Sequence, residues 1–166
     1  MFFLTGIYVL AAFLGEQSGF ATPHGPGKSS EHSGGFTKFT NVGATNITEE
    51  NVTGAIFSGQ NLSGAIIVRS NATGADFSGV NLSGAMLDSS NFTGANFSQA
   101  NLKGATINSS NMTGANFAGA CLEGITIYAS NFEKADLTGA ILTGAEMQYT
   151  SLDTAVMTGV VRDVSC

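Results

Sequence analysis

The chain has 166 residues, enough for one domain, with a formal net charge of −6 and only 11% charged residues. Its 6 lysines and arginines form no basic stripe, so the sequence disfavours nucleic-acid binding. Scarce charge and 22 glycines could indicate disorder, but an apolar residue recurs at every fifth position through most of the chain, which predicts a packed core.

The chain begins with an apolar run over residues 2–14, which is too short to cross a bilayer but has the length of a signal-peptide core. Gly19 and Ala21 supply the small residues that precede a cleavage site. We therefore predict a signal peptide over residues 1–21 and export to a secreted, periplasmic or organelle-lumen location, with no membrane attachment after cleavage. Because no Lys or Arg precedes the run, an uncleaved anchor or a capping helix stays open.

Residues 22–40 are dominated by Gly, Ser and Pro, which predicts a flexible linker or an N-terminal cap of the domain that follows. His24 and His32 are interpreted as solvated linker residues, because Pro23 lacks the backbone N–H that copper-binding amino-terminal motifs deprotonate. We predict no metal site and no cofactor.

Residues 41–160 carry the five-residue period. An α-helix would rotate such a pattern around its axis and a flat strand has a period of two, so we predict a chain that turns a corner every five residues. A longer period of twenty is superposed, because segments beginning at Ile66, Met86, Thr106, Thr126 and Glu146 lack the Gly that the other three corners mostly carry. We interpret the Gly corners as turns with positive φ and the fourth as a turn that tolerates Ser or Arg.

The stretch NATGADFSGVNLSGA, which begins at Asn71, shows the pattern clearly: Ala, then Asp or Asn, then Leu or Phe, then two looser positions. This pattern resembles the pentapeptide-repeat family. The resemblance implies an all-β fold, a right-handed four-sided parallel β-helix of about six coils of twenty residues, with coils ~4.8 Å apart. It sorts the apolar centres into four stacks, one of which comprises Phe57, Phe77, Phe97, Phe117, Leu137 and Met157.

Two cysteines are present: Cys121 replaces Asn in its column, and Cys166 lies in a C-terminal tail of residues 161–166. An even number of cysteines in an exported chain permits a disulfide. However, Cys121 lies two coils before Val161, so ~9.6 Å of rise separates them. Since a bridge needs Cα atoms within about 7 Å, the geometry disfavours it unless the tail folds back.

The repeat contains no histidine that could serve as a catalytic base, and its carboxylates scatter over all four faces, so we predict that the chain is not an enzyme. We therefore predict an exported rigid scaffold that is structural or binds a macromolecular partner, which we expect to be a protein; the oligomeric state stays open. Some members of the family mimic DNA and inhibit DNA gyrase. That alternative is weaker here, because those members are cytosolic dimers with acidic faces.

A second alternative is ice binding by one face on which Asn and Thr stand two residues apart. This candidate interaction face comprises Asn51, Thr53, Asn71, Thr73, Asn91, Thr93, Asn111 and Thr113. Two strand residues span roughly 6.6 Å and coils repeat at ~4.8 Å, which makes a flat lattice similar to the Thr arrays of β-helical antifreeze proteins. Against it, the column continues as Glu133 and Asp153, and Thr could simply fill a permissive outward position.

Overall fold

The computed structural model describes residues 46–166. The predicted signal peptide (1–21), the predicted linker or cap (22–40) and residues 41–45 lie outside this part of the chain. Regular strands occur once in every twenty residues. They are β1 (Asn46–Thr48), β2 (Ile66–Val68), β3 (Met86–Asp88), β4 (Thr106–Asn108), β5 (Thr126–Tyr128) and β6 (Glu146–Gln148).

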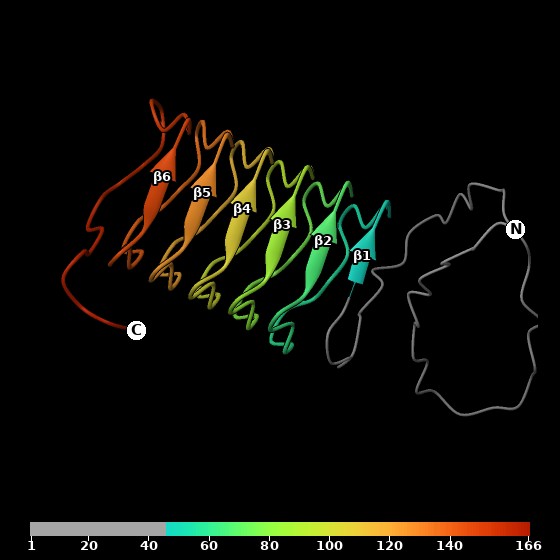
Figure 1. Ribbon diagram of the computed structural model, residues 1–166, viewed down its shortest axis with the longest axis horizontal. Coiled ribbons are helices and arrows are strands. Elements are labelled where there is room, and N and C mark those ends of the chain that lie inside the picture. The colour runs from blue at the N-terminus through green and yellow to red at the C-terminus, as the bar shows by residue number, and fades with distance from the viewer. Residues whose placement is uncertain (1–45) are drawn as a thin grey trace, which may run out of the picture.

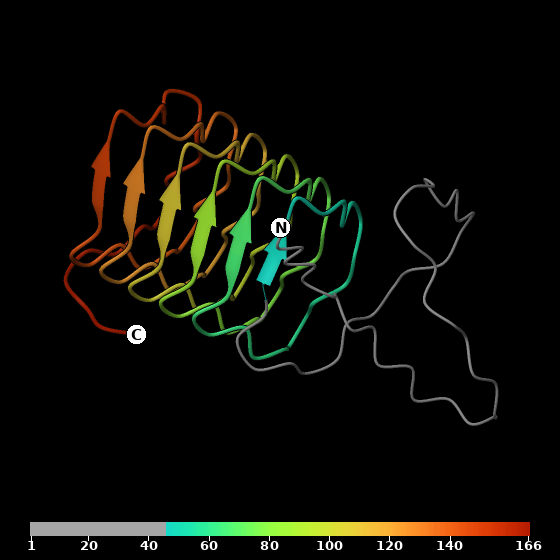
Figure 2. The same cartoon turned by 45° about the vertical axis from the view of Figure 1, so that its right-hand side comes forward.

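The strands form one six-stranded parallel sheet in sequence order, and they stand side by side along the length of the molecule (Figure 1). Each residue pairs with the one twenty positions later, as Ile67 does with Leu87. The three other faces are held by isolated parallel bridges at the same interval, in columns that begin at Asn51, Ile56 and Asn61. The stacked coils are visible in Figure 2. The predicted four-sided parallel β-helix is confirmed.

Backbone hydrogen bonds link each coil to both of its neighbours. The Asn81 N–H donates back to the Gln60 carbonyl at 2.9 Å, and the next N–H, of Leu82, donates forward to the Asn101 carbonyl at 2.7 Å. Because these bonds run along the stack, the backbone polar groups of inner coils are paired without any helix. Accordingly, none of residues 46–166 belongs to a helix that could cross a membrane.

The core is a narrow column filled by the central residue of each pentapeptide. The rings of Phe57, Phe77, Phe97 and Phe117 stack with centroids 4.7–4.9 Å apart and planes within 4°. This spacing matches the distance between paired strands, as predicted. Burial of apolar surface at about 25 cal/mol per Å² makes these stacks the main stabilising term.

The chemistry of the corners differs from our expectation. Gly corners do adopt positive φ, as at Gly94 (65°). The residue that directly follows each strand does so as well, as at Ser89 (51°) after β3 and Ser109 (49°) after β4. The same holds for Glu49, Arg69, Ala129 and Tyr149. The absence of Gly therefore does not mark a corner with ordinary φ, and side chains here accept the left-handed cost of roughly 1–2 kcal/mol per residue.

A buried serine ladder distinguishes the strand corner. The Ser90 N–H donates to the Ser110 Oγ at 3.1 Å, and that hydroxyl faces the Asn108 carbonyl at 3.0 Å. Equivalent bonds join Ser70 to Ser90 and Ser110 to Ser130. At the other corners an N–H donates to the carbonyl three residues earlier, as from Ala95 to Phe92. The serine hydroxyl thus replaces a turn hydrogen bond that the wider strand corner lacks.

Candidate functional site

The predicted Asn/Thr face consists of four copies of one motif, stacked in register. Parallel bridges join Asn51 to Asn71, Asn71 to Asn91 and Asn91 to Asn111. In every copy the Thr hydroxyl donates to the Asn Oδ1 at 2.6 Å, and that oxygen also accepts the Thr backbone N–H at 3.0–3.2 Å. The eight predicted residues are therefore brought together as a regular array.

These internal bonds change what the face offers to a ligand. An Asn side chain that accepts the N–H two residues later forms an Asx turn, which fixes the corner. Each Thr hydroxyl proton is already committed to the neighbouring Asn, so the face presents methyl groups and amide N–H groups more than free hydroxyl donors. The array ends at Glu133, whose N–H is accepted by Asn131 and whose carboxylate is exposed.

Acidic side chains of residues 46–166 stand on all four faces. Asp136 and Asp76 share one face, Glu133 lies on the Asn/Thr face, Glu123 on a third and Glu146 on the sheet. Within these residues, no face gathers the clustered negative charge that DNA mimicry needs. Residues 46–166 contain no histidine, since both histidines precede residue 46 in the sequence.

The sheet, together with the adjoining Tyr149, carries four of the six exposed large apolar side chains among residues 46–166. Ile66 and Met86 are neighbours on β2 and β3, and Tyr128 on β5 meets Tyr149 edge to face with ring centroids 5.2 Å apart. Tyr149 is 80% exposed, far more than a tyrosine whose ring is packed in a core. We call the outward side of β1–β6, with the adjoining Tyr149, the sheet face.

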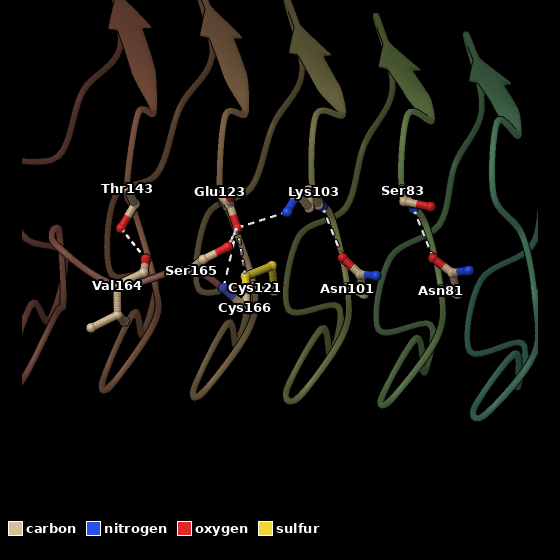
Figure 3. The surroundings of a disulfide bond; sticks show 10 residues. All are labelled: Asn81, Ser83, Asn101, Lys103, Cys121, Glu123, Thr143, Val164, Ser165 and Cys166. Atoms are coloured by element: carbon tan, nitrogen blue, oxygen red, sulfur yellow. Dashed lines mark hydrogen bonds and ion pairs between the residues drawn. A yellow bond between two sulfur atoms is a disulfide. The ribbon is translucent and has the colours of Figure 1, made fainter.

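The C-terminal tail forms a second polar cluster, which is shown in Figure 3. Cys121 and Cys166 are joined by a disulfide with a Cα–Cα distance of 5.9 Å. Our expectation that the geometry disfavours this bridge is wrong. The tail folds back along the outside of the coils, and five extended residues reach up to ~17 Å, which exceeds the ~9.6 Å rise of two coils.

Glu123 is the centre of this cluster. Its Oε2 accepts the Ser165 hydroxyl at 2.7 Å and the Cys166 N–H at 3.1 Å, and it lies 3.0 Å from the Lys103 Nζ (Figure 3). The hydrogen bond from Ser165, followed by that from Lys103, lowers the pKa of Glu123 below its usual range. Thr143 adds a further hold on the tail by donating its hydroxyl to the Val164 carbonyl.

Sequence reasoning missed this cluster, although a signal was present. Lys103 and Glu123 carry opposite charges and lie twenty residues apart at the same outward position. The twenty-residue register places such side chains next to each other on neighbouring coils. Arg69 and Glu49 repeat the arrangement at 2.7 Å on the strand corner. The folding back of the C-terminal tail could not be predicted from residue spacing, because the tail does not follow the repeat.

The comparisons with known proteins agree with this geometry. The family model for pentapeptide repeats matches in 8 copies over residues 55–94, 90–127 and 125–159. The chain therefore belongs to the pentapeptide repeat family, whose members are generally non-enzymatic structural or interaction proteins. No curated protein matches it by sequence.

Among solved structures, the chain is similar to a pentapeptide repeat protein from the thylakoid lumen of Arabidopsis thaliana. The two are 34% identical with a TM-score of 0.58, over 60% of this chain and 69% of that one. It also matches QnrB1, a plasmid-mediated fluoroquinolone resistance protein, with 23% identity and a TM-score of 0.45 over 71% and 72% of the two chains. A pentapeptide repeat protein from Nostoc gives 21% identity and a TM-score of 0.40 over 62% and 84%.

Proposed function

We propose that this protein is an exported, non-enzymatic scaffold that binds a partner protein through one face of a rigid β-helix. The observation that carries the proposal is that the inside and the outer surface of the β-helix have different roles. In the inner coils the central side chain of each pentapeptide is buried in the core, and the backbone N–H and C=O groups form hydrogen bonds between coils. What remains for function is an outer surface that is held in a fixed lattice.

The sheet face is the part of this surface that suits a protein partner. Tyr and Met are enriched in the cores of protein interfaces, and Tyr buries much area there with little loss of side-chain freedom. The exposed side chains of this face are Tyr128, Tyr149, Met86 and Ile66. On the Asn/Thr face, by contrast, the Thr hydroxyls already donate to neighbouring Asn side chains. The β-strands already pair on both sides except at the two ends, so recognition would use side chains rather than strand addition.

Three observations support export. The apolar run of residues 2–14 has the features of a signal peptide, although it lies outside the described residues. The disulfide between Cys121 and Cys166 is typical of oxidising compartments. The similar protein from Arabidopsis thaliana is a thylakoid lumen protein. Intact-mass measurement on material from the native host tests this, and we expect a mature chain that begins at Thr22. A full-length chain recovered from the cytosol would contradict export.

Site-specific photo-crosslinking tests the proposed binding face. A photoreactive residue at position 149 should give one defined protein adduct in the native compartment, and Tyr128→Ser in the same chain should reduce its yield. The matched control places the same residue at Thr93, on the Asn/Thr face, and should give no such adduct. Equal adducts from both positions, or none from either, would argue against the sheet face as the interface.

Ice binding through the Asn/Thr face is a second candidate, because the motif repeats in register over four coils. Thermal hysteresis of the mature protein measures it, with Thr93→Tyr as a variant that roughens the face without touching the core. The commitment of each Thr hydroxyl to Asn weakens this candidate relative to the scaffold. Absence of hysteresis in the unmutated protein at millimolar concentration would remove it.

A further inference from the structure

We propose that, when the Cys121–Cys166 disulfide is reduced, the two thiolates and the Glu123 carboxylate form a binding site for one zinc-like divalent cation. The Sγ atoms of both cysteines and a carboxylate oxygen of Glu123 lie within 4.8 Å of one another. The Cys166 Sγ is 3.8 Å from the Glu123 Oε2. Two ligand atoms on one tetrahedral zinc, at about 2.0–2.3 Å each, are separated by roughly this distance.

The site does not depend on the disulfide for its assembly. Three contacts hold the tail beside Glu123 in addition to the covalent bond: the Ser165 hydroxyl, the Cys166 N–H and the Thr143 bond to the Val164 carbonyl. On the other side, Cys121 and Glu123 are fixed by the coil, where Cys121 pairs with Asn101 and Ile141. Reduction therefore leaves two thiols that the structure already keeps close together.

Charge favours a divalent ion over other occupants. Two thiolates and one carboxylate carry three negative charges, and a divalent cation leaves one. The ammonium group of Lys103, 3.0 Å from the carboxylate in the oxidised form, balances that remaining charge. Thiolate sulfur with one carboxylate oxygen is a ligand set that zinc accepts, and three protein ligands leave the fourth position for water.

The disulfide-bonded form and the metal-bound form exclude each other, because both use the same two sulfur atoms. A dithiol reductant transfers two electrons and two protons to the disulfide, which yields the Cys121 and Cys166 thiols and leaves the reductant as a disulfide. The cation then displaces both thiol protons to solvent as it binds the two sulfurs. Oxidation of the thiols by a disulfide oxidant would release the cation. The tail is thus fastened covalently under oxidising conditions and by metal under reducing ones.

Cobalt titration tests the proposal, because tetrahedral thiolate-bound Co²⁺ absorbs strongly in the near ultraviolet and visible while free Co²⁺ does not. The whole chain is reduced, freed of reductant anaerobically and titrated with Co²⁺, then with Zn²⁺ as competitor. We expect one cobalt per chain, displaced by one zinc, and no spectrum from the oxidised protein. Sedimentation should show that binding leaves the oligomeric state unchanged.

Three variants locate the site. Cys166→Ser should abolish the thiolate-to-cobalt band, and Glu123→Gln should weaken binding by at least about tenfold, because loss of a partner that only supports a ligand already costs about ten- to a hundredfold. Glu133→Gln, which alters an exposed carboxylate on another face, should bind as the unmutated chain does. Circular dichroism of each reduced variant checks that the coils remain folded. The proposal is overturned if the reduced chain shows no cobalt spectrum, if Cys166→Ser or Glu123→Gln binds equally well, or if the metal bridges two chains.

Discussion

The ring of Phe97 stacks on the ring of Phe117 one coil later, with 4.9 Å between centroids and 4° between planes. Both rings are fully buried. Phe97→Ala should therefore lower the free energy of unfolding by roughly 3–5 kcal/mol, because it removes a large side chain from the middle of the stack and leaves a cavity. Denaturant unfolding followed by circular dichroism measures the loss.

Phe97→Leu is the informative companion to this variant, because Leu137 occupies the same column without disrupting the coil. It should cost clearly less than Phe97→Ala. Tyr149→Ala, at an exposed ring whose one described aromatic contact is with Tyr128, should lower the free energy of unfolding by no more than about 1.5 kcal/mol. Similar losses for Phe97→Ala and Tyr149→Ala would contradict a stability based on the inner stacks.

The serine ladder predicts a loss at a small side chain. Ser110→Ala removes the acceptor of the Ser90 N–H and the donor to the Asn108 carbonyl, both in buried surroundings. The Asn108 carbonyl still accepts the Ser89 N–H, so the buried Ser90 N–H is the group left without its partner, which should lower the free energy of unfolding by about 1–3 kcal/mol. Ser109→Ala, at the exposed neighbour, should be near neutral. Thermal and denaturant unfolding of the pair decide the matter, and equal effects would rule the ladder out as a stabilising feature.

Gln99 occupies a corner that is Gly in most other coils and has a φ of 58°. Gln99→Gly should relieve a left-handed cost of roughly 1–2 kcal/mol and incur an unfolded-chain entropy cost of about 0.5–1 kcal/mol, a net gain of up to about 1.5 kcal/mol. The adjacent Ser98→Gly, where φ is not positive, should only lose stability. A rise in the melting midpoint for the first variant and a fall for the second are expected; a fall for both would contradict the reasoning.

The carboxylate of Asp136 should titrate below the aspartate value of about 3.9, because the Thr138 hydroxyl and then the Thr138 N–H hydrogen-bond its charged form and lower its pKa. A pKa lowered in the folded state stabilises the fold above the unfolded pKa, and that contribution is lost as the pH falls through the folded pKa. Carboxyl carbon NMR across the acid range measures it.

Thr138→Val tests the cause of this pKa shift, since it removes the hydroxyl and keeps the backbone N–H. The pKa of Asp136 should rise towards the ordinary aspartate value, so its contribution to stability should become smaller and should be lost completely at a higher pH than in the unmutated chain. Thr73→Val removes the equivalent hydroxyl from a motif built on Asn71 and should leave the pKa of Asp136 unchanged. An unaltered pKa in Thr138→Val would assign the shift to the backbone alone.

The fold could be predicted from sequence because one short-range rule governs it. An apolar residue at every fifth position, such as Leu82 or Phe92, has only one interior to enter once the chain turns four corners per coil. The register then follows from the twenty-residue period, and with it the stacking of Phe57 on Phe77. Local pattern and global contact coincide in a solenoid, since each coil touches only its neighbours.

The polar features were harder to predict from the sequence, each for its own physical reason. The role of Ser110 depends on a hydrogen bond from a backbone N–H one coil away, and no local sequence motif predicts that bond. The positive φ of Ser89 is imposed by the stack and overrides the preference of the residue. The Cys121–Cys166 bridge depends on the path of a tail outside the repeat, where the period carries no information.

The disulfide also limits how many coils can follow Cys121 before the tail begins. Val161 stands two coils above Cys121 in the same column, and the five residues that follow return to Cys166. Each additional coil would raise the start of the tail by ~4.8 Å, while the tail itself reaches at most ~17 Å. Because the Cα atoms of the two cysteines stand 5.9 Å apart, four coils above Cys121 would still permit closure and five would not, so the disulfide limits the number of coils between Cys121 and the tail.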